Sequence, residues 1–196
     1  MNFRGTSYWP QWKKLTDMRL SIQKNPAIWR ITEMQEIHLD FLRLAADDAS
    51  MNDCPGGRER LYPPPVSQND LEEEELVEDW KEYVTSEMEM KFAGDVGTFL
   101  SDLDDARAVR RISDEESLKH YRLDVPLEHG MAWFSALNQA RLLLDIKYKL
   151  HAVPEAPLSG SVQKQPIETD EAVRLLVLMR YEFYAWIQEW LVRHVL

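Results

Sequence analysis

The feature that most constrains this chain is a long stripe of apolar side chains within residues 126–150. The apolar residues recur three or four positions apart, which gathers them on one face of an α-helix. They are Met131, Trp133, Phe134, Ala136, Leu137, Ala140, Leu143, Leu144 and Tyr148, and Leu142, Ile146 and Leu150 widen the stripe. Because so wide a stripe needs neighbours on two sides, the pattern predicts a central helix surrounded by other helices.

A narrow polar ridge divides the apolar surface of this central helix. Asn138, Arg141 and Asp145 are spaced i, i+3 and i+7, so each side chain can contact the next. If the ridge is buried, it forms a polar network that fixes which helix packs against it. If it lines an open pocket, it binds a ligand or a partner. These three are the candidate binding residues, and the sequence predicts no catalytic residue.

Charge and composition exclude several classes of function. The net charge of −11 over 196 residues argues against nucleic acid as the principal partner, because affinity for nucleic acid depends on Lys and Arg neutralising phosphates. The single cysteine, Cys54, fits a reducing compartment, and the five histidines form no zinc-binding pattern. Charged residues interrupt the apolar C-terminal segment. We therefore expect a cytoplasmic protein with no metal, no cofactor and no membrane span, and leave open whether it forms a homo-oligomer.

Further helices are expected on both sides of the central one. Thr32 is the expected N-cap of the first, with Gln35 completing a capping box, and Asp124 is the expected N-cap of the central helix. Gly94 and Gly97 indicate a strip where another helix packs closely. The expected helices cover residues 32–49, 69–84, 86–103, 126–150 and 169–196, with loops at about 50–68 and 151–169.

The first 30 residues differ in charge from the rest of the chain. They carry six basic residues and one acidic residue, Asp17, without a sustained apolar period. This composition predicts a basic irregular arm that lies across the acidic remainder, or else a docking arm for an acidic partner. Two short segments, residues 29–31 and residues 121–124, are expected to be extended.

Together these patterns predict an all-α fold. We expect a single-domain bundle of about five helices over residues 31–196, preceded by the arm. The central and C-terminal helices form its inner pair, and at most one minor short strand pair accompanies them.

Two segments of the chain carry Trp, Leu and Ala at helical spacing together with a few polar residues, namely Ala136-Leu137-Asn138-Gln139-Ala140-Arg141-Leu142 and Trp186-Ile187-Gln188-Glu189-Trp190-Leu191-Val192. In these segments the chain resembles an uncharacterised bacterial family of small helical proteins, often encoded beside the adaptor of the Clp protease. The resemblance covers roughly residues 70–196, and it implies a helical fold and no activity. It also implies that Asn138 and Arg141 occupy the family's characteristic polar positions.

Two function classes follow from the sequence. The leading hypothesis is a cytoplasmic protein-interaction or adaptor-like module of unknown partner, linked to Clp-dependent proteolysis by the gene context that the resemblance implies. The alternative is a small-molecule-binding or enzymatic helical protein that uses the polar ridge. Burial discriminates between them, because a ridge sealed between helices is structural and a ridge lining a pocket is functional.

Overall fold

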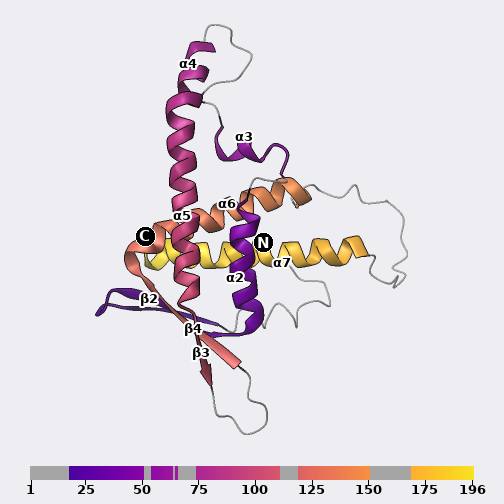
Figure 1. The fold of residues 1–196 in the computed structure, drawn as a ribbon. Coiled ribbons are helices and arrows are strands. Elements are labelled where there is room, and N and C mark those ends of the chain that lie inside the picture. Colours follow the sequence, from indigo (N-terminus) through magenta and orange to yellow (C-terminus); the bar gives the residue numbers. More distant parts are fainter. Residues whose placement is uncertain (1–17, 51–53, 64, 66–73, 111–118, 151–168) are drawn as a thin grey trace.

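The computed structural model describes residues 18–50, 54–63, 65, 74–110, 119–150 and 169–196. Its helices pack beside a four-stranded antiparallel sheet, which lies at the lower end of the helices in Figure 1. The strands are β1 (Arg19–Gln23), β2 (Ile28–Met34), β3 (Arg107–Arg110) and β4 (Lys119–Pro126), in the spatial order β1-β2-β4-β3. The protein is therefore mixed α and β, and the prediction of an all-α bundle with one minor strand pair was wrong.

The strands form because apolar residues alternate with polar ones. A period of two places alternate side chains on opposite faces of a sheet, so that one face is buried and the other meets solvent. In β2 and β4 the buried members are Trp29, Ile31, Tyr121, Leu123 and Val125. The two extended segments predicted from the sequence are thus confirmed. Residues 19–23 and 28–30 are strands and not part of an irregular arm, whereas residues 1–17 of that arm lie outside the described part of the chain.

A β-bulge ends β2 and directs the chain into the first helix. Between Ile31 and Met34 the pairing with β4 shifts, and Glu33 adopts a φ of 59°. The extra residue turns the Met34 side chain into the core, where it is fully buried. Helix α2 (Glu36–Asp48) follows, with the Gln35 backbone N–H donating to His38 Nδ1 at 2.8 Å. The N-cap is therefore Gln35 and not Thr32.

Helix α6 (Gly130–Tyr148) is the predicted central helix. It contacts α7 (Thr169–His194), α5 (Ser86–Asp104), α2 and the short α3 (Gly57–Leu61). The helix begins at Gly130, because residues 124–126 complete β4 and a 3-10 turn, η3 (Leu127–His129), follows. Asp124 is therefore a strand residue and not the N-cap of the central helix.

The core lies between the inner face of the sheet and the helices. Trp133 of α6 is fully buried at its centre, with ring centroids 4.8 Å from Trp29 of β2 and 4.5 Å from Phe99 of α5. A Cβ atom on Gly130 would lie 2.6 Å from Val195 Cγ1, so the start of α6 needs glycine for the C-terminal segment to pack there. The core therefore joins strands and helices from both halves of the chain.

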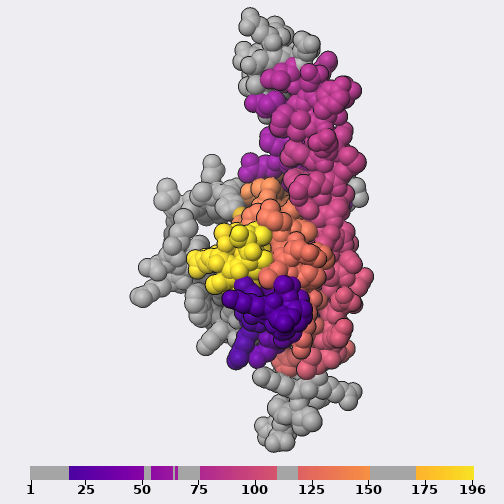
Figure 2. All heavy atoms as spheres, turned by 90° about the vertical axis from the view of Figure 1, so that its left-hand side faces the viewer, coloured from indigo at the N-terminus to yellow at the C-terminus, as the bar shows by residue number. Residues whose placement is uncertain are grey.

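Two helical segments lead directly into α5. The first is α4 (Glu74–Asp79), and the second is a π-helical segment, η2 (Trp80–Thr85). Thr85 Oγ1 donates to the Trp80 carbonyl oxygen at 3.2 Å. Figure 2 shows this run as one continuous ridge along the surface, coloured magenta. A Cβ atom at Gly94 or Gly97 would have no neighbour within 4 Å, so the predicted close packing of another helix on these glycines is wrong.

Candidate functional site

Arg141, the middle residue of the polar ridge of α6, contacts α7. Arg141 Nη1 donates to Gln188 Oε1 at 2.6 Å, and Nη2 donates to the Tyr181 hydroxyl at 3.1 Å. The guanidinium also lies over the Tyr181 ring, 4.6 Å from its centroid. The Gln188 amide in turn donates to the Phe134 carbonyl at 3.0 Å, which ties α7 back to α6. Arg141 therefore links α6 to α7 through hydrogen bonds.

The other two ridge residues are known by their exposure. Asn138 and Asp145 are both half-buried on α6. The next residue after Asn138, Gln139, is buried and donates to the Phe92 carbonyl of α5 at 3.4 Å. The sequence did not predict that Tyr181 and Gln188 bond to Arg141, or that Gln139 bonds to α5. Gln188 carried a signal, because it interrupts the apolar surface of the last helix, but the sequence does not show which residue it meets.

A second polar set joins the end of α2 to α7. Arg180 Nη1 donates to Asp48 Oδ1 at 3.1 Å, and both side chains are largely buried. The Tyr184 hydroxyl lies 2.9 Å from Asp48 Oδ2 and 2.8 Å from the Phe41 carbonyl oxygen, and its single hydrogen donates to one of them at a time. Desolvation by burial raises the pKa of Asp48, against the opposing charge of Arg180, and burial also raises the pKa of Tyr184.

A sequence signal for this set existed. Asp47 and Asp48 end α2, whose last turn has no basic residue, and acidic side chains there oppose the negative end of the helix dipole. An unfavourable placement of this kind indicates that a cation from elsewhere compensates it. That cation is Arg180, which is 132 residues away in the sequence.

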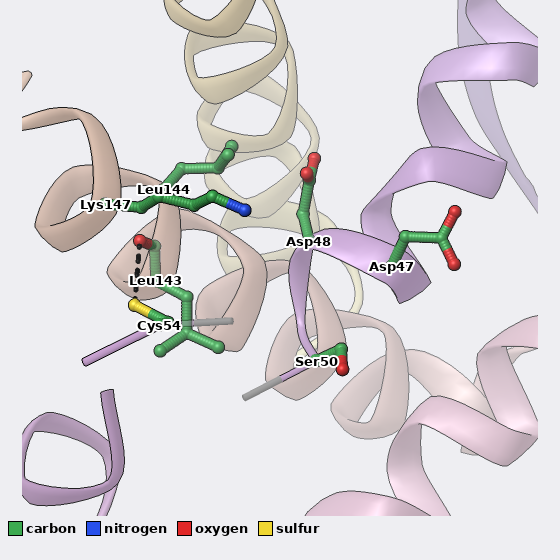
Figure 3. Close-up of a pocket in the computed structure, with 7 residues that line it drawn as sticks. All are labelled: Asp47, Asp48, Ser50, Cys54, Leu143, Leu144 and Lys147. Carbon is green, nitrogen blue, oxygen red and sulfur yellow. Dashed lines mark hydrogen bonds between the residues drawn. The ribbon is translucent and has the colours of Figure 1, made fainter. Parts of the chain in front are cut away.

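A pocket of about 230 Å³ opens beside Asp48. It lies between the end of α2, the segment around Cys54 and the last turns of α6. Figure 3 shows the Lys147 ammonium and the Asp48 carboxylate extending toward the same space from opposite walls. The lining residues are Asp47, Asp48, Ser50, Cys54, Leu143, Leu144 and Lys147.

The chemistry available in this pocket is limited. Cys54 is buried, and its thiol donates to the Leu143 carbonyl oxygen at 3.7 Å. The lining holds two carboxylates, Asp47 and Asp48, and one cation, Lys147, and Arg180 pairs with Asp48 from outside the lining, so these charges balance. Among the described residues, no group of three or more His, Cys, Asp or Glu could hold a metal ion. The described residues that line the pocket therefore present no arrangement for nucleophilic or metal-assisted catalysis.

A third polar cluster joins α5 to the start of α6. His129 Nδ1 lies 2.9 Å and 3.1 Å from the two Asp102 carboxylate oxygens, and Trp133 Nε1 donates to Oδ2 at 2.8 Å. Because the carboxylate accepts, Nδ1 carries the proton. In the part of the chain that the structure describes, no hydroxyl or thiol is hydrogen-bonded to His129, so the pair fixes two helices without forming a catalytic triad.

Residues 31–195 match the profile of a domain of unknown function, DUF2017. The chain belongs to the DUF2017 family. The matched region begins within β2 and extends to the end of α7, so it includes Arg141, Gln188 and all three polar clusters, whereas β1 precedes it.

Two further comparisons give no additional assignment for this DUF2017 protein. No curated protein and no solved structure matches it significantly. In the described segments, no helix is long and apolar enough to cross a membrane.

Proposed function

We propose that this DUF2017 protein is a protein-interaction module and that it binds its partner through a projecting helix. We define the projecting helix as residues 76–94, which include the end of α4, all of η2 and the first half of α5. The sequence led to the hypothesis of a protein-interaction module, and the projecting helix is the surface that we propose for that interaction.

The observation that carries the proposal is the exposure of large apolar side chains along the projecting helix. Leu76 is 50% exposed, Tyr83 is 62% exposed and Met90 is 69% exposed. Side chains of this size and chemistry are those that anchor protein interfaces. Three of them on one 19-residue helix make it a candidate for insertion into an apolar groove.

The opposite side of the projecting helix is fixed to the body of the protein. Phe92 stacks on Tyr62, with ring centroids 5.5 Å apart, and Arg58 of α3 forms an ion pair with Glu89. These contacts hold the helix in place before a partner arrives, and such preorganisation lowers the entropic cost of binding. The π-helical segment within it supports the same proposal, because short π-helical turns are frequent at functional sites.

The charge of the projecting helix specifies the chemistry of the partner. Its exposed acidic residues are Glu78, Asp79, Glu82 and Glu87, and its two basic residues are Lys81 and Lys91. Lys91 is already paired with Asp95 at 2.5 Å. The expected partner is therefore a protein with an apolar groove bordered by Lys or Arg.

Gene context, as implied by the family resemblance, indicates where to look for this partner. We propose Clp-dependent proteolysis in the cytoplasm as the first process to test, with the protein acting as an adaptor-like module. The alternative function, ligand binding by the polar ridge, is less well supported, because the Arg141 guanidinium is already engaged by Gln188 and Tyr181 between two helices.

The test compares two variants in a crosslinking capture from native cells, followed by affinity measurement with the purified partner. The first variant carries Leu76→Ser, Tyr83→Ser and Met90→Ser. The matched control carries Val173→Ser and Leu176→Ser, which replace exposed apolar residues on α7.

We expect the partner captured by the wild type to bind the first variant at least about 30-fold more weakly, a change of about 2 kcal/mol. The control variant should bind like the wild type. If the first variant retains full affinity for every partner of the wild type, the projecting helix is not the binding element.

A further inference from the structure

The sheet has an outer face that carries a charge opposite to that of the rest of the protein. Because Trp29, Ile31, Leu123 and Val125 face the core, the residues between them face outward, and direct cross-strand partners share a face. By this pairing the outer face carries Arg30 on β2, Arg122 and Asp124 on β4, and Arg107 and Val109 on β3.

The strands as a whole are basic. They contain six basic residues, Arg19, Arg30, Arg107, Arg110, Lys119 and Arg122, and two acidic residues, Glu33 and Asp124. The complete chain has a net charge of −11. Positive charge is therefore concentrated on the sheet of an acidic protein, which makes this face the natural site for an anionic partner.

Two like-charged residues lie directly opposite each other in this sheet. Arg107 of β3 pairs with Arg122 of β4, and Arg107 is exposed. Like charges at directly opposed positions destabilise a sheet. A cost of this kind at one edge of a structure is typical of a residue kept for binding.

The same face already binds one carboxylate. Arg30 donates to the two oxygens of Asp124 at 2.5 Å and 3.1 Å, and Arg122 Nε donates to Asp124 Oδ1 at 3.0 Å. Each guanidinium donates to the carboxylate through Nε and Nη2, the bidentate geometry in which arginine recognises carboxylates most strongly. Arg107 lies opposite Arg122 and is exposed, and among the described residues it forms no ion pair.

We propose that the outer face of the sheet binds an acidic segment of a partner protein, with the Arg107 guanidinium holding a carboxylate of that segment beside the Arg122–Asp124 pair. An acidic peptide fits this face better than nucleic acid does. Val109 is 43% exposed beside the arginines and offers an apolar contact that a phosphate backbone would not use. The negative remainder of the protein would also repel a long polyanion. This surface is separate from the projecting helix, and the proposal does not depend on that function.

The test measures, by fluorescence anisotropy, the binding of a labelled peptide of alternating Glu and Val residues. The binding of a labelled single-stranded DNA of equal charge is measured in the same way for comparison. Arg107→Glu is compared with Arg43→Glu, because Arg43 is an exposed arginine of α2 and not of the sheet. Thermal melting of each free protein accompanies the binding measurement.

We expect the wild type to bind the peptide more tightly than the DNA. Arg107→Glu should weaken peptide binding at least tenfold and raise the melting temperature of the free protein, because it replaces the like-charged pair with Arg122 by an opposite-charged one. Arg43→Glu should change peptide binding less than twofold. The proposal is overturned if the wild type does not bind the peptide, if DNA binds more tightly, or if the two variants lose binding equally.

Discussion

Arg141 of α6 and Gln188 of α7 form a hydrogen bond of 2.6 Å, and Gln188 completes its own bonding with the Phe134 carbonyl of α6. The glutamine amide thus accepts from one residue of α6 and donates to another two turns earlier. This arrangement fixes the position of α7 along α6, because a shift of one helix by a turn would break both bonds.

The first prediction concerns this hydrogen bond. Arg141→Met should lower the free energy of unfolding by about 2 kcal/mol, since it leaves the buried Gln188 oxygen without its charged donor. Chemical denaturation measures this change. In a double-mutant cycle with Gln188→Leu, the two losses should be clearly less than additive. Strictly additive losses would show that the bond does not contribute to stability.

The second prediction concerns the centre of the core. Trp133→Ala should lower the free energy of unfolding by about 3–5 kcal/mol, because it removes a fully buried ring packed against Trp29 and Phe99. Thermal or chemical denaturation gives the value. Tyr83→Ala, at an exposed aromatic residue, is the matched control and should cost less than about 0.5 kcal/mol. Equal losses in the two variants would contradict the described core.

The third prediction concerns the buried ion pair between α2 and α7. Arg180→Met should destabilise the fold by about 3–5 kcal/mol, because Asp48 keeps a buried charge without its cation. Adding Asp48→Asn removes that charge and leaves an acceptor for Tyr184, so the double variant should recover much of the loss. A double variant no more stable than Arg180→Met would mean that packing, and not charge, explains the effect.

The fourth prediction concerns acid stability and the sheet. Hydrogen bonds from Arg122 and Arg30, the former being the larger cause, lower the pKa of Asp124 well below its usual range. A carboxylate whose pKa is lower in the folded state stabilises the fold above the unfolded pKa of about 3.9 and loses this contribution as the pH falls below it.

Denaturation at pH 7 and pH 3 tests whether Asp124 stabilises the fold more at the higher pH. Asp124→Asn should destabilise the protein at pH 7 and have a smaller effect at pH 3, where the wild-type carboxylate loses part of its advantage. An equal effect at both pH values would show that the ionised form of Asp124 does not stabilise the sheet.

The helices could be predicted from the sequence because helical periodicity is local. The stripe around Trp133 identified α6, and the C-terminal pattern identified α7. The sheet was missed because each strand is short and because the pairing of β2 with β4, which joins the two halves of the sheet, is distant in the sequence. Arg30 and Asp124, for example, are 94 residues apart, and neither short segment contains enough alternation to identify the other.

The candidate site was predictable to a similar degree. The ridge spacing identified Arg141 as a polar residue within an apolar surface, but its partners Tyr181 and Gln188 lie 40 and 47 residues away. The roles of Asn138 and Asp145 in binding stay predictions. The basic face of the sheet could not be seen at all, because Arg107 and Arg122 become neighbours only through the pairing of β3 with β4.

The pairing of β2 with β4 has a consequence for synthesis of the protein in the cell. The β1–β2 hairpin leaves the ribosome first, but the residues of β4 follow about 94 positions later. At roughly 5–20 residues per second, the nascent hairpin waits about 5–20 s for that strand. During this interval Trp29 and Ile31, which the finished fold buries completely, are exposed to solvent and available to chaperones.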